Sequence, residues 1–296
     1  MNRYDQLIVD LGNDYRPQRE WGEGRGVLLV IGHFLVGVAG GTWLLSTVFG
    51  VSAGFFVAYV FGALGGLTHL MFLGHPEVAF KMMRNVRTSW VSRGFVGLSL
   101  FLLGGGLYLA LLLLQLGDAW QALRLLAQGV AMLGALTVIG YMGFCYTASK
   151  AIPFWHSSLH PALYIAYAVR GGIAALLVIA AVTGTLANAL LLQLWVAVSA
   201  IVTLFFIFEI QGAWTSANVA AKWSVRDVLA GRLALTFYGG TLAMGLIVPA
   251  LLSSAAQTPL IMAAIGLASA AGDFFMKLTT VKAGVYLPLV MPSSRR

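Results

Sequence analysis

Residues 69–93 read HLMFLGHPEVAFKMMRNVRTSWVSR and form the longest polar, basic interruption in a chain that is otherwise a series of apolar segments. Lys81, Arg84, Arg87 and Arg93 recur within it at intervals of three, three and six residues. On an α-helix this spacing predicts a basic stripe along one side. A basic amphipathic segment between two hydrophobic spans lies on a membrane surface or binds a soluble partner, unless it is simply a solvated interfacial loop.

The composition around this segment is that of a membrane protein. Of the 296 residues, 59% are hydrophobic and only 9% are charged, and the mean hydropathy is +0.87. In a soluble domain about a quarter of the residues would be charged. The formal net charge of +8 does not indicate nucleic-acid binding, because the basic residues lie in short loops beside apolar spans.

The apolar segments predict the fold. Segments of roughly 20 apolar residues cross the ~30 Å hydrocarbon core of a bilayer as helices. We therefore expect an all-α, polytopic protein with one integral membrane domain over residues 1–296. Long polar connections alternate with tight ones, which favours two four-helix bundles, and the even number of spans places both termini on one side. The eight spans are expected near residues 26–49, 51–73, 91–116, 123–148, 161–184, 186–211, 231–253 and 258–278.

Charged residues gather on the side of the termini. Of the 18 Lys and Arg residues, 16 lie there; the exceptions are Arg124 and Arg170. All five histidines also lie towards this side, so we expect the function there. The positive-inside rule makes this side cytoplasmic. Loops that dock an acidic protein would, however, be basic in either orientation.

The single cysteine limits the metal chemistry of the chain. Cys145 lies within an apolar run. One thiol forms no internal disulfide, cannot hold an iron–sulfur cluster alone and does not build a zinc site. Any redox metal must therefore belong to a partner or be bound by histidine.

Two histidines lie inside the apolar spans. His33 is about two turns into the first span and His69 about one turn from the end of the second, which places them at similar depth. An ionisable residue at that depth needs a reason. His33 is a packed histidine bonded to a carbonyl, a donor to a quinone carbonyl, or a haem ligand. In the last case His69 would be the second ligand of one b-type haem.

Arg170 is the deepest charge in the sequence and must find an acceptor inside the bundle. The candidate partners are Glu209 and Asp273. Because Asp273 and Lys277 are an i, i+4 pair that can satisfy each other, Glu209 is the better partner. A structural ion pair and a proton-handling one are both consistent with this pattern.

Aromatic residues flank the polar end of the fourth span. The stretch YMGFCYTASKAIPFWHSSLHP contains four of these ring side chains, namely Tyr141, Tyr146, Trp155 and His156. Aromatics at this level form an interfacial belt or a pocket. A quinone head group needs an apolar slot with two donors near its carbonyls, and His33 with a span-four tyrosine would meet that need.

The stretch RNVRTSWVSR resembles the Arg-Thr-Ser-Trp-Leu-Ser-Arg stretch of membrane anchors of the dimethyl sulfoxide reductase and polysulfide reductase type, the NrfD-like family. In that family it follows a Leu-Gly-x-Pro turn, which here is Leu73-Gly74-His75-Pro76. Weaker similarity covers most of the chain, including GVAGGTWLL, IPFWHSSLHP and the glycine-rich seventh span. Phe72 and Gly94 depart from the family pattern, which has a histidine and an acidic residue there.

The resemblance implies an eight-helix subunit without haem, iron–sulfur cluster or metal site of its own, and without a catalytic role towards the main substrate. Such a subunit anchors a four-cluster ferredoxin-like iron–sulfur subunit and a molybdopterin catalytic subunit containing Mo or W. It exchanges electrons with quinone or quinol, either menaquinone or ubiquinone. Its location would be the cytoplasmic membrane of a bacterium or archaeon.

The resemblance also assigns residues by position. His33 is similar to the span-one histidine that lines the quinone pocket, and Tyr146, or else Tyr141, is similar to the span-four tyrosine. The expected quinone-binding set is His33, Tyr146, Tyr141, His69, Arg93 and Asp273. The residues expected to dock the iron–sulfur partner are Lys81, Arg84, Asn85, Arg87, Trp90, Trp155 and His156.

Three other functions are compatible with the sequence. The first is a b-type cytochrome subunit with His33 and His69 as haem ligands. The second is a secondary transporter, although no convincing inverted repeat accompanies Arg170. The third is a passive anchor, for which replacement of His33 would not change quinone-linked electron flow.

Overall fold

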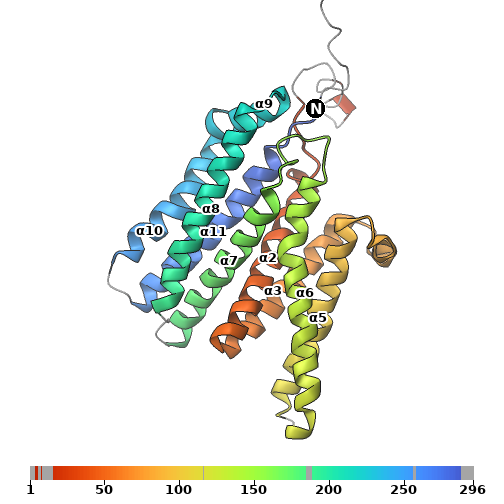
Figure 1. The fold of residues 1–296 in the computed structure, drawn as a ribbon, viewed down its shortest axis with the longest axis vertical. Helices are drawn as coiled ribbons and strands as arrows, with labels where there is room; N and C mark the ends of the chain where they lie inside the picture. The colour runs from red at the N-terminus through yellow and green to blue at the C-terminus, as the bar shows by residue number, and fades with distance from the viewer. Residues whose placement is uncertain are drawn as a thin grey trace, which may run out of the picture.

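A computed structural model describes residues 4, 5, 8, 16–115, 117–184, 189–255 and 258–287, which form a helical bundle (Figure 1). Within these residues, eight helices are long and apolar enough to cross a membrane, which confirms the predicted all-α fold with eight spans. The spans are built from α2 (Val27–Phe49), α3 (Ser52–Leu73), α5 (Trp90–Leu113), α6 (Gln121–Thr147), α7 (His160–Thr183), α8 (Ala189–Thr215), the π-helix η5 (Thr236–Ile247) with α10 (Val248–Ser253), and α11 (Pro259–Lys282).

The spans form two groups of four. One contains α2, α3, α5 and α6, and the other contains α7, α8, η5 with α10, and α11. The groups meet where α2 packs against α7, and these two helices are the most buried spans. A side chain at Gly41 would begin 1.9 Å from the carbonyl oxygen of Ala168, and one at Gly172 would begin 2.4 Å from Gly41. Glycine at both positions therefore permits the close approach.

The described segments at the two ends of the chain meet at one end of the bundle. Pro17 and Val285 form an antiparallel bridge, and the backbone N–H of Gln18 donates to the carbonyl oxygen of Gly284 at 2.7 Å. The N–H of Tyr286 donates to the carbonyl of Arg16 at 2.9 Å. We call this the terminal end. The first and the last described segments both reach it, as an even number of spans requires.

The basic segment after α3 is not one amphipathic helix, so the prediction of a single basic stripe was wrong. Gly74, at φ +78°, ends α3 in the left-handed conformation. Three short helices follow: η2 (Pro76–Val78), α4 (Ala79–Met82) and η3 (Met83–Asn85). A turn then leads to α5, and its N–H groups at Thr88 and Ser89 donate to the carbonyl of Asn85. Lys81, Arg84, Arg87 and Arg93 consequently lie on four separate elements.

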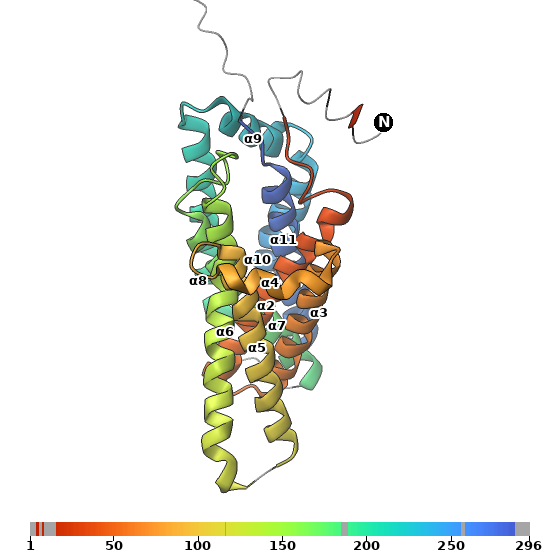
Figure 2. The same ribbon diagram turned by 90° about the vertical axis from the view of Figure 1, so that its right-hand side faces the viewer.

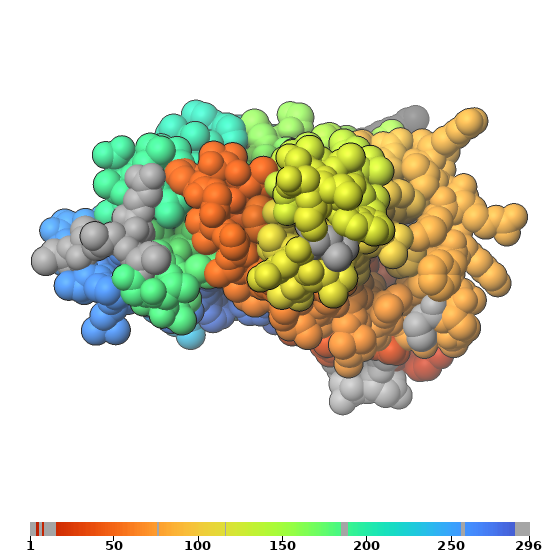
Figure 3. Space-filling view, turned by 90° about the horizontal axis from the view of Figure 1, so that it is seen from below, coloured from red at the N-terminus to blue at the C-terminus, as the bar shows by residue number. Residues whose placement is uncertain are grey.

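The α4 region lies across the bundle axis beside α5 (Figure 2). Seen from the end opposite to the termini, it projects sideways beyond the spans (Figure 3). The other long connection that contains a helix follows α8. There Asn218 caps α9 (Val219–Ala230), its side-chain oxygen accepting from the N–H groups of Ala220 and Ala221.

Candidate functional site

A cavity of about 570 Å³ lies among α2, α3, α5 and α6, within the size range of small-molecule sites. Its walls are almost entirely apolar. Two lining side chains lie partly on the outer surface of the bundle. Leu67 of α3 is 53% exposed and Val91 of α5 is 43% exposed. Phe80 of α4, 72% exposed, lies at the same margin. The cavity therefore opens sideways, towards the lipid, between α3 and α5.

The polar side chains of the cavity converge at its inner wall. His69 places Nδ1 2.6 Å from the carbonyl oxygen of Gly65, one turn earlier in α3. Because a carbonyl only accepts, Nδ1 carries the proton and Nε2 is an acceptor. The hydroxyl of Tyr141, on α6, then donates to Nε2 at 3.0 Å. Both ring nitrogens of His69 are thus engaged within the protein.

His33, on α2, is the polar side chain of this wall that remains available to form a hydrogen bond with a ligand. Its ring centroid lies 5.0 Å from that of His69 and 6.2 Å from that of Tyr141. The side chain is buried, 4% exposed, and it lines the cavity. Within the described part of the chain its ring has no hydrogen-bond partner. A ligand in the cavity would therefore meet an imidazole able to donate or accept a hydrogen bond.

The structure brings three of the six expected quinone-binding residues to this cavity, namely His33, His69 and Tyr141. Tyr146, the tyrosine preferred from the sequence, does not line it. It lies behind His33, at 6.4 Å between ring centroids, and packs against Trp155 and Tyr164. The geometry therefore favours Tyr141 over Tyr146 as the span-four tyrosine of the site.

The other two expected residues lie elsewhere. Arg93 turns back towards the loop, where Nε donates to the carbonyl of Val86 at 2.9 Å and Nη2 to that of Arg87 at 2.8 Å. Asp273 is buried in α11 and pairs with Arg170, whose Nε lies 2.8 Å from Oδ1. Neither side chain lines the cavity.

The partner expected for Arg170 was therefore wrong. Its guanidinium pairs with Asp273 rather than with Glu209, because α7 and α11 pack side by side and bring the two groups together. Lys277 follows Asp273 by one turn of α11, and its side chain contacts a tyrosine ring. Its ammonium lies 4.3 Å from the centre of the Tyr164 ring, a cation–π contact.

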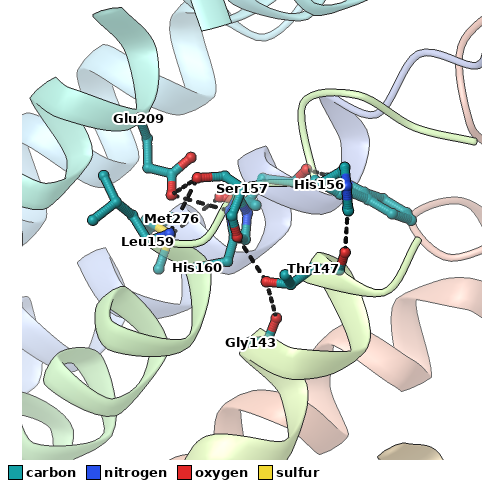
Figure 4. A network of polar contacts seen from close by, with 10 residues as sticks. Gly143, Thr147, His156, Ser157, Leu159, His160, Glu209 and Met276 are labelled. Atoms are coloured by element: carbon teal, nitrogen blue, oxygen red, sulfur yellow. Dashed lines mark hydrogen bonds and ion pairs between the residues drawn. The ribbon is translucent and has the colours of Figure 1, made fainter. Parts of the chain in front are cut away.

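Glu209 instead belongs to a polar network at the terminal end (Figure 4). Its Oε1 accepts from the hydroxyl of Ser157 at 2.7 Å and lies 3.2 Å from Nδ1 of the buried His160. The hydroxyl of Thr147 donates to the carbonyl of Ser157 at 2.7 Å, and the carbonyl of Thr147 contacts Nδ1 of His156. This network was not predicted from the sequence. The histidine beside Pro161 at the start of a span was its available signal.

The residues expected to dock a partner divide into two sets. Trp155 is only 2% exposed, its Nε1 donates to the carbonyl of Thr280 at 2.9 Å, and its ring stacks on Trp21. The expectation of a docking role for Trp155 is therefore corrected: its side chain is part of the core. Trp90 is half-buried and stacks on Phe144, with 4.1 Å between the ring centroids. The exposed members of the set are Lys81, Arg84, Asn85, Arg87 and His156.

Comparison with known proteins agrees with the resemblance seen in the sequence. Residues 25–287 match the family model described as Polysulphide reductase, NrfD, which covers all eight spans. No individual curated protein matches the chain significantly. Members of this family are membrane subunits of polysulfide reductase and other oxidoreductase complexes. A match over most of the chain shows that this protein belongs to the polysulphide reductase NrfD family of multi-pass membrane proteins.

Proposed function

We propose that this chain binds quinone or quinol in the cavity between α3 and α5 and exchanges electrons with an iron–sulfur partner at the terminal end. The observation that carries the proposal is His33, a buried imidazole on the inner wall of an apolar cavity open to lipid, which has no hydrogen-bond partner among the residues that the structure describes. An apolar slot with a few convergent polar groups is the usual form of a small-molecule site.

The residues of the inner wall suit a quinone head group. A bound quinone supplies two-electron redox chemistry coupled to two protons. His33 would donate to, or accept from, one of its oxygens. Tyr141 and His69 form a hydrogen-bonded pair beside it, and the tyrosine hydroxyl is fixed in direction by that bond. The apolar walls exclude water from the ring. The engagement of both His69 nitrogens in these bonds does not favour the haem alternative.

The partners we propose are a four-cluster ferredoxin-like iron–sulfur subunit and, beyond it, a molybdopterin subunit. The terminal end carries the exposed basic side chains of residues 81–87, which fit an acidic docking surface. With the positive-inside rule, this end faces the cytoplasm of a bacterial or archaeal cell. The cavity lies on the same side of the membrane as the docking surface, so electrons need not cross the bilayer.

Reversing charge in the basic loop should release the partners. Purification under mild detergent is expected to yield the chain with iron, sulfide and molybdenum or tungsten in a co-eluting assembly. The variant Arg84→Glu/Arg87→Glu should lower the yield of that assembly about tenfold, because rim charges of opposite sign become like charges. Arg124→Glu, at the opposite end of the bundle, is the control. Wild-type protein that elutes alone and without metals would refute the proposed partners.

Blocking the lateral opening should discriminate between quinols by tail length. Leu67→Trp places an indole in the mouth, whereas Leu64→Trp adds the same group one turn earlier on α3, at a site 46% exposed that does not line the cavity. With a long isoprenoid quinol in proteoliposomes, we expect Leu67→Trp to raise KM about tenfold while kcat is retained. A short-tailed analogue should be much less affected. Equal effects of the two variants would rule out this entrance.

A further inference from the structure

Tyr141 also lines a second hollow, separate from the cavity. It is a groove of about 480 Å³ along α5 and α6, bordered by Ile165 of α7. Leu100, Leu136 and Ile165 in its walls are 37%, 52% and 37% exposed. The groove is therefore an apolar trough on the membrane-facing surface. It runs from Arg93 to Leu100, which is about 10 Å at the rise of an α-helix.

A positively charged side chain, Arg93, lines the groove at its end nearest the terminal end of the bundle. Arg93 lies in the first turn of α5, at the level where lipid head groups meet a membrane helix. Its guanidinium lies 4.1 Å from the centre of the Trp90 ring, and Trp90 itself stacks on Phe144. The bonds from Nε and Nη2 to the loop carbonyls fix the plane of the group. Nη1 has no hydrogen-bond partner among the described residues.

The charges around the mouth favour an anion. Lys81, Arg84 and Arg87 are exposed on the adjoining segment. The one acid of residues 74–93, Glu77, contacts His75 at 3.0 Å. A guanidinium held in this way matches the oxygens of a phosphodiester, and the surrounding positive charge favours a lipid with net negative charge over a zwitterionic one.

We propose that this groove is a binding site for an anionic phospholipid, with its phosphate at Arg93 and an acyl chain along α5 and α6. The positive charge of Arg93 matches the phosphate of such a lipid, and the apolar walls of the groove match its acyl chain. Its inner wall is Tyr141, which also lines the cavity. An acyl chain in the groove thus supports the Tyr141 ring and its bond to His69. This last step rests on the proposed function, whereas lipid binding does not.

Filling the groove tests the binding. A Cβ atom at Gly140 would lie 3.7 Å from the Phe144 ring and 3.8 Å from Ile165, which are ordinary contact distances, and because Gly140 lines the groove, the side chain of Gly140→Leu is expected to occupy part of it. Gly129→Leu is the matched control, because a Cβ atom there meets nothing within 4 Å. Native mass spectrometry of the delipidated protein, titrated with phosphatidylglycerol, should count one fewer bound lipid for Gly140→Leu. The control should equal the wild type.

Removing the cation tests the head-group preference. The wild type should bind phosphatidylglycerol about tenfold more tightly than phosphatidylcholine, and Arg93→Gln should bring the two affinities to within about twofold. Equal affinities in the wild type, or an unchanged lipid count in Gly140→Leu, would overturn the proposal.

Quinol oxidation is measured on the same samples. If the delipidated wild type oxidises quinol at the same rate with and without added phosphatidylglycerol, the link through Tyr141 is wrong; if the wild type with bound lipid oxidises no quinol, only the proposed function fails.

Discussion

Replacing His33 with alanine is expected to lower kcat/KM for quinol oxidation by the assembled complex about 100-fold, the lower range for loss of a general acid–base group. The side chain is 4% exposed and lines the cavity. The neighbouring polar groups, His69 and Tyr141, are bonded to each other, so neither replaces it without breaking that bond. The measurement is the steady-state rate with an isoprenoid quinol and an artificial acceptor at the iron–sulfur subunit.

A second variant at the same position separates the roles of His33. Glutamine retains a hydrogen-bond donor but takes up no proton, so His33→Gln should keep most of the quinol affinity and lose most of kcat. His75→Ala is the control, because this histidine is exposed at the surface and pairs with Glu77. An unchanged rate in His33→Ala, with the complex intact, would make the cavity vestigial and leave the chain a passive anchor.

The eight spans were predictable because the bilayer demands a fixed length of apolar helix, and that demand is visible in composition. The rotation of each helix was not. Tyr141 and Tyr146 are five residues apart, which at 3.6 residues per turn turns their side chains roughly 140° away from each other. Both sit at the polar end of an apolar helix, so hydropathy cannot choose between them. Packing places one at the cavity and the other in the core.

The pairing of buried charges was likewise decided by packing rather than by sequence spacing. The i, i+4 rule linked Asp273 to Lys277, but it describes exposed helix surfaces, where each pair contributes little. Inside the bundle, the planar guanidinium of Arg170 presents several donors to one carboxylate, and Lys277 can rest on tyrosine rings instead. Which helix lies beside which was not available from the sequence. The contact of Glu209 with His160 could not be predicted for the same reason, because it too depends on which helices lie side by side.

Replacing Asp273 with asparagine is expected to destabilise the protein by about 3–5 kcal/mol, the usual cost of breaking a buried ion pair from one side. Arg170 and Asp273 are each 1% exposed at the side chain, so water does not screen the charge that remains. The measurement is the free energy of unfolding in detergent, with Asp118→Asn as the control, because Asp118 is exposed at the far end of the bundle.

The position of Lys277 makes the effect asymmetric. In Asp273→Asn, two buried cations, Arg170 and Lys277, lose the carboxylate that lies between α7 and α11. In Arg170→Gln, the carboxylate still has Lys277 one turn away on its own helix. Arg170→Gln should therefore cost roughly half as much as Asp273→Asn, and the double variant should cost less than the sum of the two single variants. A larger loss in Arg170→Gln than in Asp273→Asn would contradict this account, because it would show that Lys277 does not compensate the charge of the Asp273 carboxylate when Arg170 is removed.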